Sequence, residues 1–267
     1  MHPILVHVHI FYQNLWQELA DKIKNIPYPF DLFITIVEKN QNLQKKILDD
    51  FPDAKIEVVA NRGFDVGPFV HIINKVNLDN YSYIIKLHTK NDCKPHTYII
   101  HSYNMSFHLW RKHLLNFMGK KKLLKILKEF EKRPTLGMVG HYKLITNKRG
   151  DEIALQKCME LNRKLGFKNN DYTHVGGTMF IARANIFKPL QKLNLQLSDF
   201  EEPTLHQSQL AHAIEGLLGV LVTDQGYTIE DVTVPKFYQY LAYRCTRIRK
   251  IYHARIFRKI GEFFKKN

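Results

Sequence analysis

The chain has 267 residues, of which 45% are hydrophobic and 12% aromatic, and its formal net charge is +15. This composition is typical of a globular protein and excludes a disordered chain, and no run of about 18 apolar residues is present to span a bilayer. The length allows one large domain with its own core, or a domain with an appendage. The basic excess favours partners that carry phosphate: nucleic acid, anionic lipid or phosphorylated small molecules.

The three cysteines, Cys93, Cys158 and Cys245, are odd in number and far apart. Their spacing matches neither a disulfide framework nor a zinc site, so no metal ligands are predicted among them and a reducing, cytoplasmic location is expected. The opening letters MHPILVHVHIFY lack a basic leader and a small-residue cleavage site. We therefore expect them to form a first strand and not a signal peptide.

The first 90 residues predict strands that alternate with helices. Apolar runs predict strands at 4–11, 30–37, 55–60 and 83–88, and helical spacing predicts helices at 15–26, 42–51 and 68–76. This alternation predicts an α/β fold, with a mostly parallel sheet covered by helices on both faces.

The second half is less regular. We expect helices at 98–132, 152–165 and 205–218, strands at 136–139 and 219–223, and a strand followed by a helix within 174–187. Residues 236–267 have basic and apolar positions at helical spacing, which predicts a basic amphipathic tail. The chain is thus divided into a domain, 1–235, and a tail, 236–267.

The stretch NRGFDVGPF follows the third predicted strand and begins a helix. Ligands of open α/β sheets bind beyond the carboxyl ends of such strands, and glycines let the backbone approach a ligand closely. A simple turn in which Asp65 caps the next helix is the alternative, but it gives no role to Arg62. The loop is therefore predicted to bind a ligand.

The stretch KLHTKND follows the fourth predicted strand and reaches the same rim. His88 and Lys90 lie on one side by strand alternation, and two cations there suit a diphosphate. An ordinary polar loop is the alternative.

Two later motifs are weaker. Gly176 and Gly177 precede an apolar strand, which indicates a bulge or a close backbone approach. His212 and Glu215 lie on neighbouring turns of a predicted helix. Such a pair is usually structural, and a metal site there would need a third ligand.

Together these motifs resemble the rhamnan synthesis protein F family of bacterial polysaccharide glycosyltransferases. The matching pieces span about residues 3–227 and are VHVHIFY, IPYPFDLFIT, NRGFDVGPF, IIKLHTK, GGTMFIAR and LAHAIEGLLG. The resemblance implies a GT-A-like fold in which the first four strands bind a nucleotide sugar and the later half binds the acceptor. It places these residues at the donor: Asn61, Arg62, Gly63, Asp65, Gly67, His88 and Lys90.

Within this resemblance, Arg62 would contact a phosphate or hold Asp65, and Asp65 would bind hydroxyls or the base. Many GT-A enzymes hold Mg²⁺ or Mn²⁺ with an Asp-x-Asp motif, which this chain lacks. Metal dependence is therefore left open, and Lys90 could supply positive charge to the departing diphosphate.

Inverting transfer needs a general base, usually a carboxylate. Asp199 and Glu201 match an acidic stretch of the family and are the first candidates, followed by Glu202 and Glu215. Gly176, Gly177, His212 and Glu215 would lie on the acceptor side. The acceptor would be a growing cell-surface polysaccharide or a lipid-linked saccharide.

Two other classes of function stay open. The charge also fits a nucleic-acid-binding protein, although no recognition motif is present. The missing Asp-x-Asp fits a non-catalytic subunit of a polysaccharide assembly complex. The tail fits a peripheral position on the anionic inner face of the plasma membrane, or a last helix packed on the domain.

Overall fold

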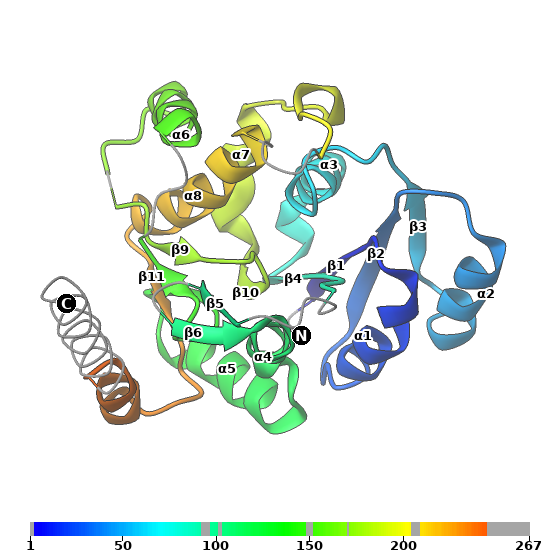
Figure 1. The fold of residues 1–267 in the computed structure, drawn as a ribbon, viewed down its shortest axis with the longest axis horizontal. Coiled ribbons are helices and arrows are strands. Elements are labelled where there is room, and N and C mark those ends of the chain that lie inside the picture. Colours follow the sequence, from blue (N-terminus) through cyan, green and yellow to red (C-terminus); the bar gives the residue numbers. More distant parts are fainter. Residues whose placement is uncertain are drawn as a thin grey trace, which may run out of the picture. The chain divides into compact units, whose positions relative to one another are not determined.

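A seven-stranded sheet forms the core of residues 1–231, in the order β11-β7-β10-β4-β1-β2-β3 (Figure 1). The computed structural model describes residues 3–91, 97–100, 103–147, 152–169, 171–203 and 209–244. The strands of this sheet are β1 (Ile4–Ile10), β2 (Phe30–Ile36), β3 (Lys55–Val58), β4 (Tyr83–His88), β7 (Leu136–Val139), β10 (Phe180–Arg183) and β11 (Thr228–Glu230). Two small sheets pair β5 (Thr97–Ile100) with β6 (Tyr103–Ser106) and β8 (Ile145–Thr146) with β9 (His174–Val175).

Strand direction determines where a site can form. β1 is parallel to β2 and β4, β2 is parallel to β3, and β10 runs antiparallel to both β4 and β7. The carboxyl ends of β1–β4 therefore meet at one edge of the sheet, and the segment that enters β10 comes to the same edge.

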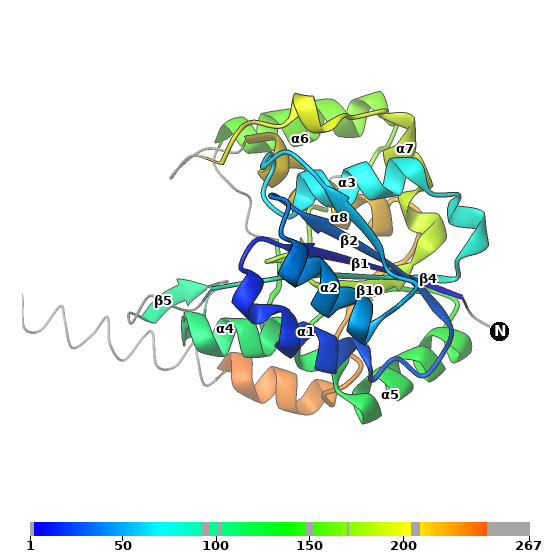
Figure 2. The same ribbon diagram turned by 90° about the vertical axis from the view of Figure 1, so that its right-hand side faces the viewer.

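Helices cover both faces of the sheet. Figure 2 shows α1, α4 and α5 on one side of the sheet and α3, α6 and α8 on the other. The helices are α1 (Trp16–Ile23), α2 (Gln41–Asp50), α3 (Val66–Lys75), α4 (Phe107–Leu114), α5 (Lys120–Lys132), α6 (Glu152–Lys164), α7 (Lys188–Lys192) and α8 (Gln209–Thr223). Short 3₁₀ turns are η1 (Gln13–Leu15), η2 (Leu78–Asn80), η3 (Asn116–Met118), η4 (Ala184–Phe187) and η5 (Leu197–Asp199).

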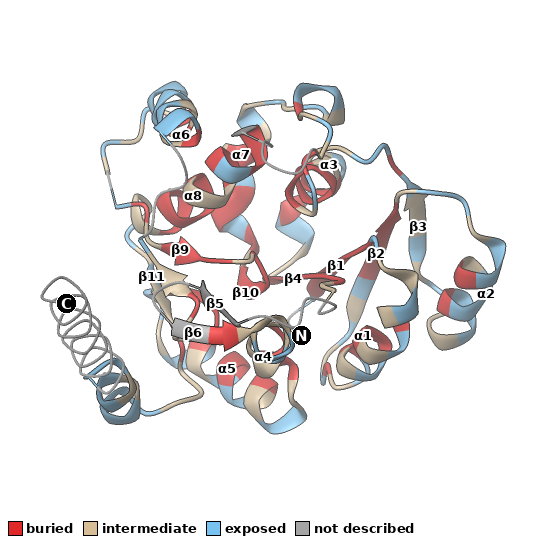
Figure 3. Cartoon of the chain, in the orientation of Figure 1, coloured by how far each residue is buried: buried red, intermediate tan, exposed pale blue. Residues whose placement is uncertain are grey.

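The amphipathic helices bury one stripe each against the sheet. In α5 the buried residues are Leu123, Ile126, Leu127 and Phe130, at the spacing expected for one helix face. All seven residues of β1 are buried, because the strand lies inside the sheet with helices on both sides (Figure 3). The predicted α/β fold with a mostly parallel, doubly covered sheet is confirmed.

Two predicted elements differ from the structure. The stretch expected to be helical over 98–132 begins with the β5–β6 hairpin, whose aromatic and β-branched residues favour strands. Residues 219–223, expected to form a last strand, are the final part of α8, where Val220, Leu221 and Val222 are all buried. β-Branched residues can form the last turn of a helix when their side chains are packed on all sides. The last strand of the described residues is instead β11.

The described contacts divide the chain into two units, Met1–Asp231 and Val232–Asn267. In the second unit residues 236–244 are helical, and the predicted tail beyond residue 244 lies outside the described residues. Among the described residues no helix is both long and apolar enough to cross a membrane. Cys158 is a buried thiol, and Cys93 and Cys245 lie outside the described residues.

Candidate functional site

A row of polar side chains lies on one face of the sheet, under α3. Strand register pairs His9 of β1 with Thr35 of β2 and with His88 of β4, and pairs His7 with Lys86. Directly opposed residues, and residues two apart in one strand, project from the same face. All five side chains are buried. The strands therefore concentrate polar groups in the interior, next to the edge where ligands bind in open α/β folds.

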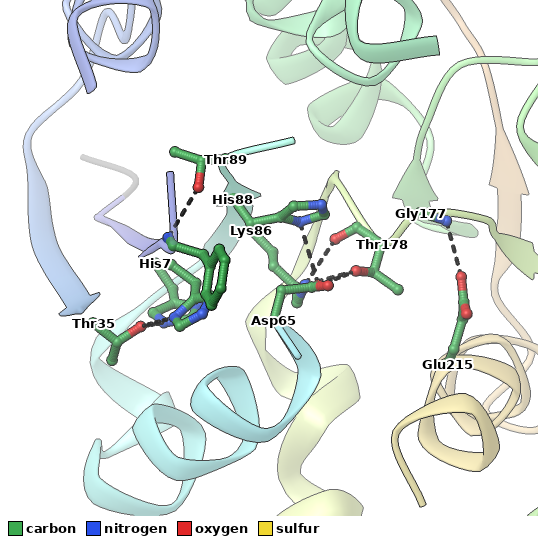
Figure 4. A network of polar contacts seen from close by, with 11 residues as sticks. His7, Thr35, Asp65, Lys86, His88, Thr89, Gly177, Thr178 and Glu215 are labelled. Carbon is green, nitrogen blue, oxygen red and sulfur yellow. Dashed lines mark hydrogen bonds and ion pairs between the residues drawn. The ribbon is translucent and has the colours of Figure 1, made fainter. Parts of the chain in front are cut away.

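Buried Lys86 and half-buried Asp65 form an ion pair at the centre of this site (Figure 4). The Lys86 side chain is fully buried, and its Nζ donates to Asp65 and to the carbonyl and hydroxyl oxygens of Thr178, the last two at 3.0 and 2.7 Å. The Thr178 hydroxyl also bonds to Asp65, and His88 Nδ1 lies 3.3 Å from Asp65 Oδ2. Asp65 thus ties the start of α3 to β4 and to the segment before β10.

Burial and charge act in opposite directions on these groups. Burial favours a raised pKa for Asp65, but contacts with His88, Lys86 and Thr178 outweigh it and hold the pKa below its ordinary value. Burial lowers the pKa of Lys86, and Asp65 opposes that shift. Burial lowers the pKa of His88 to about 3, so this imidazole is neutral at pH 7. The cluster is therefore one carboxylate balanced by one buried ammonium.

The Thr35 hydroxyl is hydrogen-bonded to two histidines, His7 and His9, beside the Lys86–Asp65 pair. His7 Nε2 and His9 Nδ1 each lie 3.0 Å from Thr35 Oγ1. A hydroxyl donates one hydrogen bond, so it donates to one ring and accepts from the other. Burial lowers the pKa of both histidines, that of His9 to about 4. The pair is held neutral and fixes β1 against β2 next to the site.

Backbone strain gathers at the same edge. Phe64 has φ +54° and Thr178 has φ +51°, a region that non-glycine residues rarely occupy and that is an outlier for a β-branched residue. The network of Asp65 and Lys86 holds Thr178 in this conformation. Such strain persists where the surroundings impose it, and it is concentrated at functional sites. The two loops therefore have the signature of a site and not of plain turns.

Lys90 lies just beyond β4, above the face of Trp110. Its Nζ is 4.3 Å from the centre of the Trp110 ring. Burial lowers the pKa of Lys90, while the charges of Asp65 and Glu215 act to raise it. Glu215 of α8 accepts a 2.9 Å hydrogen bond from the Gly177 N–H, as Figure 4 shows. Among the described residues the buried Trp110 Nε1 has no hydrogen-bond partner, which is costly unless another group binds there.

Several of the predicted donor residues lie close together in the structure, but some make contacts other than those predicted. Asp65 contacts His88 and influences Lys90. The prediction that Arg62 holds Asp65 is wrong: Lys86 does so, and Arg62 donates to the Phe200 carbonyl at 2.8 Å and to Glu202 at 3.0 Å. The alternative reading of Asp65 as a side-chain helix cap is also wrong, because its carboxylate makes no cap bond to α3.

The glycines of the loop allow close packing within the protein itself. A Cβ at Gly63, where φ is +67°, would lie 2.4 Å from the Phe200 ring, and one at Gly67 would lie 2.4 Å from the Arg62 carbonyl oxygen. The sequence predicts that both glycines bring the backbone close to a ligand. They instead let the loop pack on the 200–202 segment, whose Glu201 carbonyl accepts from the Gly63 N–H. Asn61 is exposed at the start of this loop.

The two carboxylates predicted first as general bases make local structural bonds. Asp199 is exposed and accepts from the Gln196 N–H at 2.8 Å. Glu201 pairs with Lys157 at 2.9 Å and accepts from the Leu210 N–H. Burial acts to raise the pKa of Glu201, but these contacts outweigh it and hold the pKa below its ordinary value. Both carboxylates stabilise the segment before α8, and their hydrogen bonds and ion pair are made there and not with the Asp65 cluster.

The predicted acceptor-side residues separate into two groups. Gly177 and Glu215 are hydrogen-bonded to each other, and the charge of Glu215 acts to raise the pKa of Lys90. Gly176 donates its N–H to the Leu144 carbonyl, and His212 is exposed, with its ring 5.9 Å from that of Phe64.

Sequence reasoning missed Lys86, Thr178 and Trp110. Lys86 stands inside the run YIIKLH, where a charged residue between buried neighbours needs an internal partner. That signal was available from the sequence. Thr178 and Trp110 carried none, because only the antiparallel placement of β10 and the packing of α4 bring them to the site.

The donor set does not suit a divalent metal. Within the part of the chain that the structure describes, no three His, Cys, Asp or Glu side chains lie together as ligands. The carboxylate at this edge, Asp65, is already paired with Lys86, and an adjacent ammonium repels a second cation. No step below is therefore routed through a metal ion.

Fold and site together define an α/β protein with a charged, strained site at the carboxyl ends of its parallel strands. The chain belongs to the rhamnan synthesis protein F family (RgpF), whose model matches residues 1–227. The uncharacterized protein WxcX, in two strains of Xanthomonas campestris pv. campestris, is 26% identical over 237 residues. The match covers 85% of this chain and 32% of WxcX, so the chain spans about a third of these curated relatives.

Solved structures of S. aureus TarS resemble the fold weakly. The fragment 1–349 has a TM-score of 0.43 and 13% identity, over 82% of this chain and 55% of that one. A longer TarS structure has a TM-score of 0.45 and 13% identity, over 87% and 35%. The complex of the fragment with UDP has a TM-score of 0.42 and 13% identity, over 81% and 54%. A likeness of this degree does not bear on the function of the present chain.

Proposed function

We propose that this chain is a glycosyltransferase that moves a sugar from a nucleotide-sugar donor to a growing polysaccharide or a lipid-linked acceptor. Membership of the rhamnan synthesis protein F family supports this class. The observation that carries the proposal is the position of one lysine: Lys90 lies just beyond the carboxyl end of β4, with its ammonium over the Trp110 ring. A diphosphate needs positive charge, and ligands of open α/β sheets bind at this edge.

The reaction in this proposal has one bond made and one broken. An acceptor hydroxyl oxygen bonds to the anomeric carbon of the donor, and the bond from that carbon to the diphosphate oxygen breaks. The nucleoside diphosphate leaves with the electron pair, and the hydroxyl proton passes to a carboxylate. Attack from the face opposite the leaving group inverts the anomeric centre.

Lys90 is assigned to the leaving group in this scheme. Negative charge grows on the departing diphosphate, and a preorganised, half-buried ammonium stabilises it more than a fully solvated one. Its neighbour Trp110 offers a flat ring and an unpartnered buried N–H. A donor hydroxyl or phosphate oxygen could accept that hydrogen bond and remove the cost of leaving it unmade.

Glu215 is the carboxylate best placed to act as general base. It is hydrogen-bonded to Gly177 and electrostatically coupled to Lys90 and Lys86. Asp199 and Glu201 are engaged in local bonds of the segment before α8. We therefore assign the base to Glu215 and a positioning role to the other two. Rhamnose is proposed as the transferred sugar from the family name alone.

A ligand screen tests the proposal. Thermal unfolding of the chain is measured with UDP-, GDP-, dTDP- and CMP-sugars, since a ligand at about 100 times its Kd adds roughly 2.7 kcal/mol. A gain of that size raises Tm by several degrees in a domain of this length. Slow hydrolysis of the sugar that binds would show the chemistry. If no nucleotide sugar raises Tm and none is hydrolysed, the chain is a non-catalytic subunit and the proposal fails.

A further inference from the structure

A basic groove lies on the face of the domain that carries α1, α4 and α5, away from the Asp65 cluster. It has a volume of about 620 Å³. Six Lys or Arg side chains line it against one carboxylate, that of Glu18. The six are Lys22 of α1, Arg111 and Lys112 of α4, and Lys120, Lys121 and Lys122 at the start of α5.

The positive surface continues from the groove along α5. Lys121, Lys125, Lys128 and Lys132 are all exposed. Their spacing of four, three and four residues places them on one side of the helix, opposite the buried stripe. At 1.5 Å per residue this row is roughly 16 Å long. Groove and row together form an extended lysine surface, with exposed Glu131 as an acidic residue near its far end.

Lysine side chains spread over an extended face are better suited to an anionic lipid surface than to a single phosphate group. Arginine forks bind single phosphates in a fixed geometry, whereas lysine ammonium groups act as mobile point charges. A row of such charges is attracted to the diffuse negative potential of a lipid surface. Sequence-specific nucleic-acid binding would instead need base-reading or stacking groups along the face, and the groove lining includes no Phe, Tyr or Trp.

Helix α4 connects this surface to the candidate site. Arg111 lies in the groove, pairs with Glu18 at 3.3 Å, and donates to the Lys90 carbonyl oxygen at 3.3 Å. The preceding residue, Trp110, lies under the Lys90 ammonium. A surface docked on the groove would therefore lie one helix away from the site, where an acceptor held in a membrane could reach it.

We propose that the basic groove and the lysine row of α5 dock this domain on anionic phospholipid headgroups. The docking is a property of the folded domain and needs neither the tail nor the transfer reaction. Its failure would leave the proposed transferase untouched, and the reverse also holds.

The test compares vesicle binding of three full-length chains: the wild type, the groove variant Lys112→Gln/Lys120→Gln/Lys121→Gln, and a control variant Lys39→Gln/Lys45→Gln/Lys164→Gln. All six lysines are exposed, and each variant loses the same charge and keeps the tail. Vesicles contain phosphatidylcholine with or without phosphatidylglycerol. The groove variant should bind the anionic vesicles about a hundredfold more weakly, and the control less than tenfold.

Circular dichroism confirms that each variant is folded before the comparison. Equal loss in the groove and control variants would overturn the proposal, and so would no preference of the wild type for anionic vesicles. A third arm measures binding to random duplex DNA. If the groove variant loses DNA binding while it keeps vesicle binding, the surface serves nucleic acid and the lipid proposal is wrong.

Discussion

Lys86 is a fully buried cation in the interior of a strand, and its one carboxylate partner comes from a loop 21 residues earlier. Taking two charges out of water is expensive, so a buried pair contributes little net stability by itself. The pair instead holds both side chains in place, because either charge buried without its partner would destabilise the fold far more than the pair does. The pair therefore fixes Asp65, the start of α3 and the strained Thr178 in a single arrangement.

Removing one partner should thus cost more than removing both. Lys86→Met keeps an unbranched side chain one atom shorter but leaves Asp65 without its counter-charge, and it should lower the free energy of unfolding by about 3–5 kcal/mol. The double variant Lys86→Met/Asp65→Asn should recover part of that loss. Urea unfolding measures both. Lys75→Met, which breaks an exposed pair with Glu57, is the control and should cost about 1 kcal/mol or less. A double variant less stable than Lys86→Met would contradict this account.

Lys90 should matter for turnover more than for binding. Charge on the leaving diphosphate grows in the transition state, so Lys90→Ala removes an interaction that strengthens there. A lost charge-assisted contact costs about 1.5–3 kcal/mol, roughly ten- to hundredfold in kcat. Lys90→Arg should not restore full activity, because a planar guanidinium reaches differently from an ammonium. The measurement is steady-state kinetics with the donor found by the thermal screen.

Two controls accompany the Lys90 kinetics. Lys39→Ala, an exposed lysine, should leave kcat unchanged. If EDTA abolishes activity while Lys90→Ala retains it, a metal supplies the charge and the assignment of Lys90 is wrong.

The sequence predicted part of this site and missed its centre. Asp65 and Lys90 were predicted because each lies in a polar stretch that directly follows an apolar strand. Lys86 was overlooked because it stands within the strand, where alternation with Ile85 and Leu87 shows only a facing direction. Its partner depends on where α3 returns to the sheet, and local pattern does not contain that information.

At the scale of elements, the parallel half of the sheet holds the histidine row in place. Strands β1, β2 and β4 were predicted to within a residue or so at each end, since apolar runs mark all three and a proline precedes β1 and β2. The later half was harder: β10 is antiparallel and β5–β6 is a hairpin within a stretch of helical appearance. Long-range pairing decides such segments, and sequence periodicity does not.

The buried histidines should make the sheet sensitive to acid. The pKa of His9 is lowered by burial to about 4 and that of His88 to about 3, against 6.5 for the ordinary side chain. Below pH 6.5 the unfolded state binds protons that the folded state does not, so stability falls as pH is lowered toward 4. Each such group contributes up to about 1.4 kcal/mol per pH unit in that window. Above pH 6.5 the histidines are neutral in both states, and this contribution is constant.

The measurement is the free energy of unfolding in urea between pH 7.5 and about 4.5, where Asp65 stays ionised because its folded pKa is lowered. The variant His9→Gln keeps a polar side chain near Thr35 and removes one of the titrating groups. Its stability should therefore fall less steeply with pH than that of the wild type. Identical slopes would show that His9 is not held neutral by the fold.

At the scale of the whole molecule, the second unit differs from the usual surface of a globular protein in its exposed aromatic side chains. Its described helix, residues 236–244, exposes large side chains to solvent. Phe237, Tyr238, Tyr240 and Tyr243 are each more than half exposed. Aromatic rings with this exposure are typical of segments that lie at a membrane interface. The sequence that follows, outside the described residues, keeps apolar residues at helical spacing among basic ones.

This unit should therefore contribute membrane affinity of its own. Residues 244–267 hold nine Lys or Arg against one acid, and each basic residue near an anionic surface adds on the order of 1 kcal/mol. Deletion of 244–267 should lower flotation with phosphatidylglycerol vesicles by well over tenfold and leave the thermal unfolding of the domain in place. If the segment instead packs on the domain as a last helix, the deletion will lower Tm by several degrees and leave flotation unchanged. High salt separates the two further, since it weakens attraction to lipid charge while it leaves apolar packing intact.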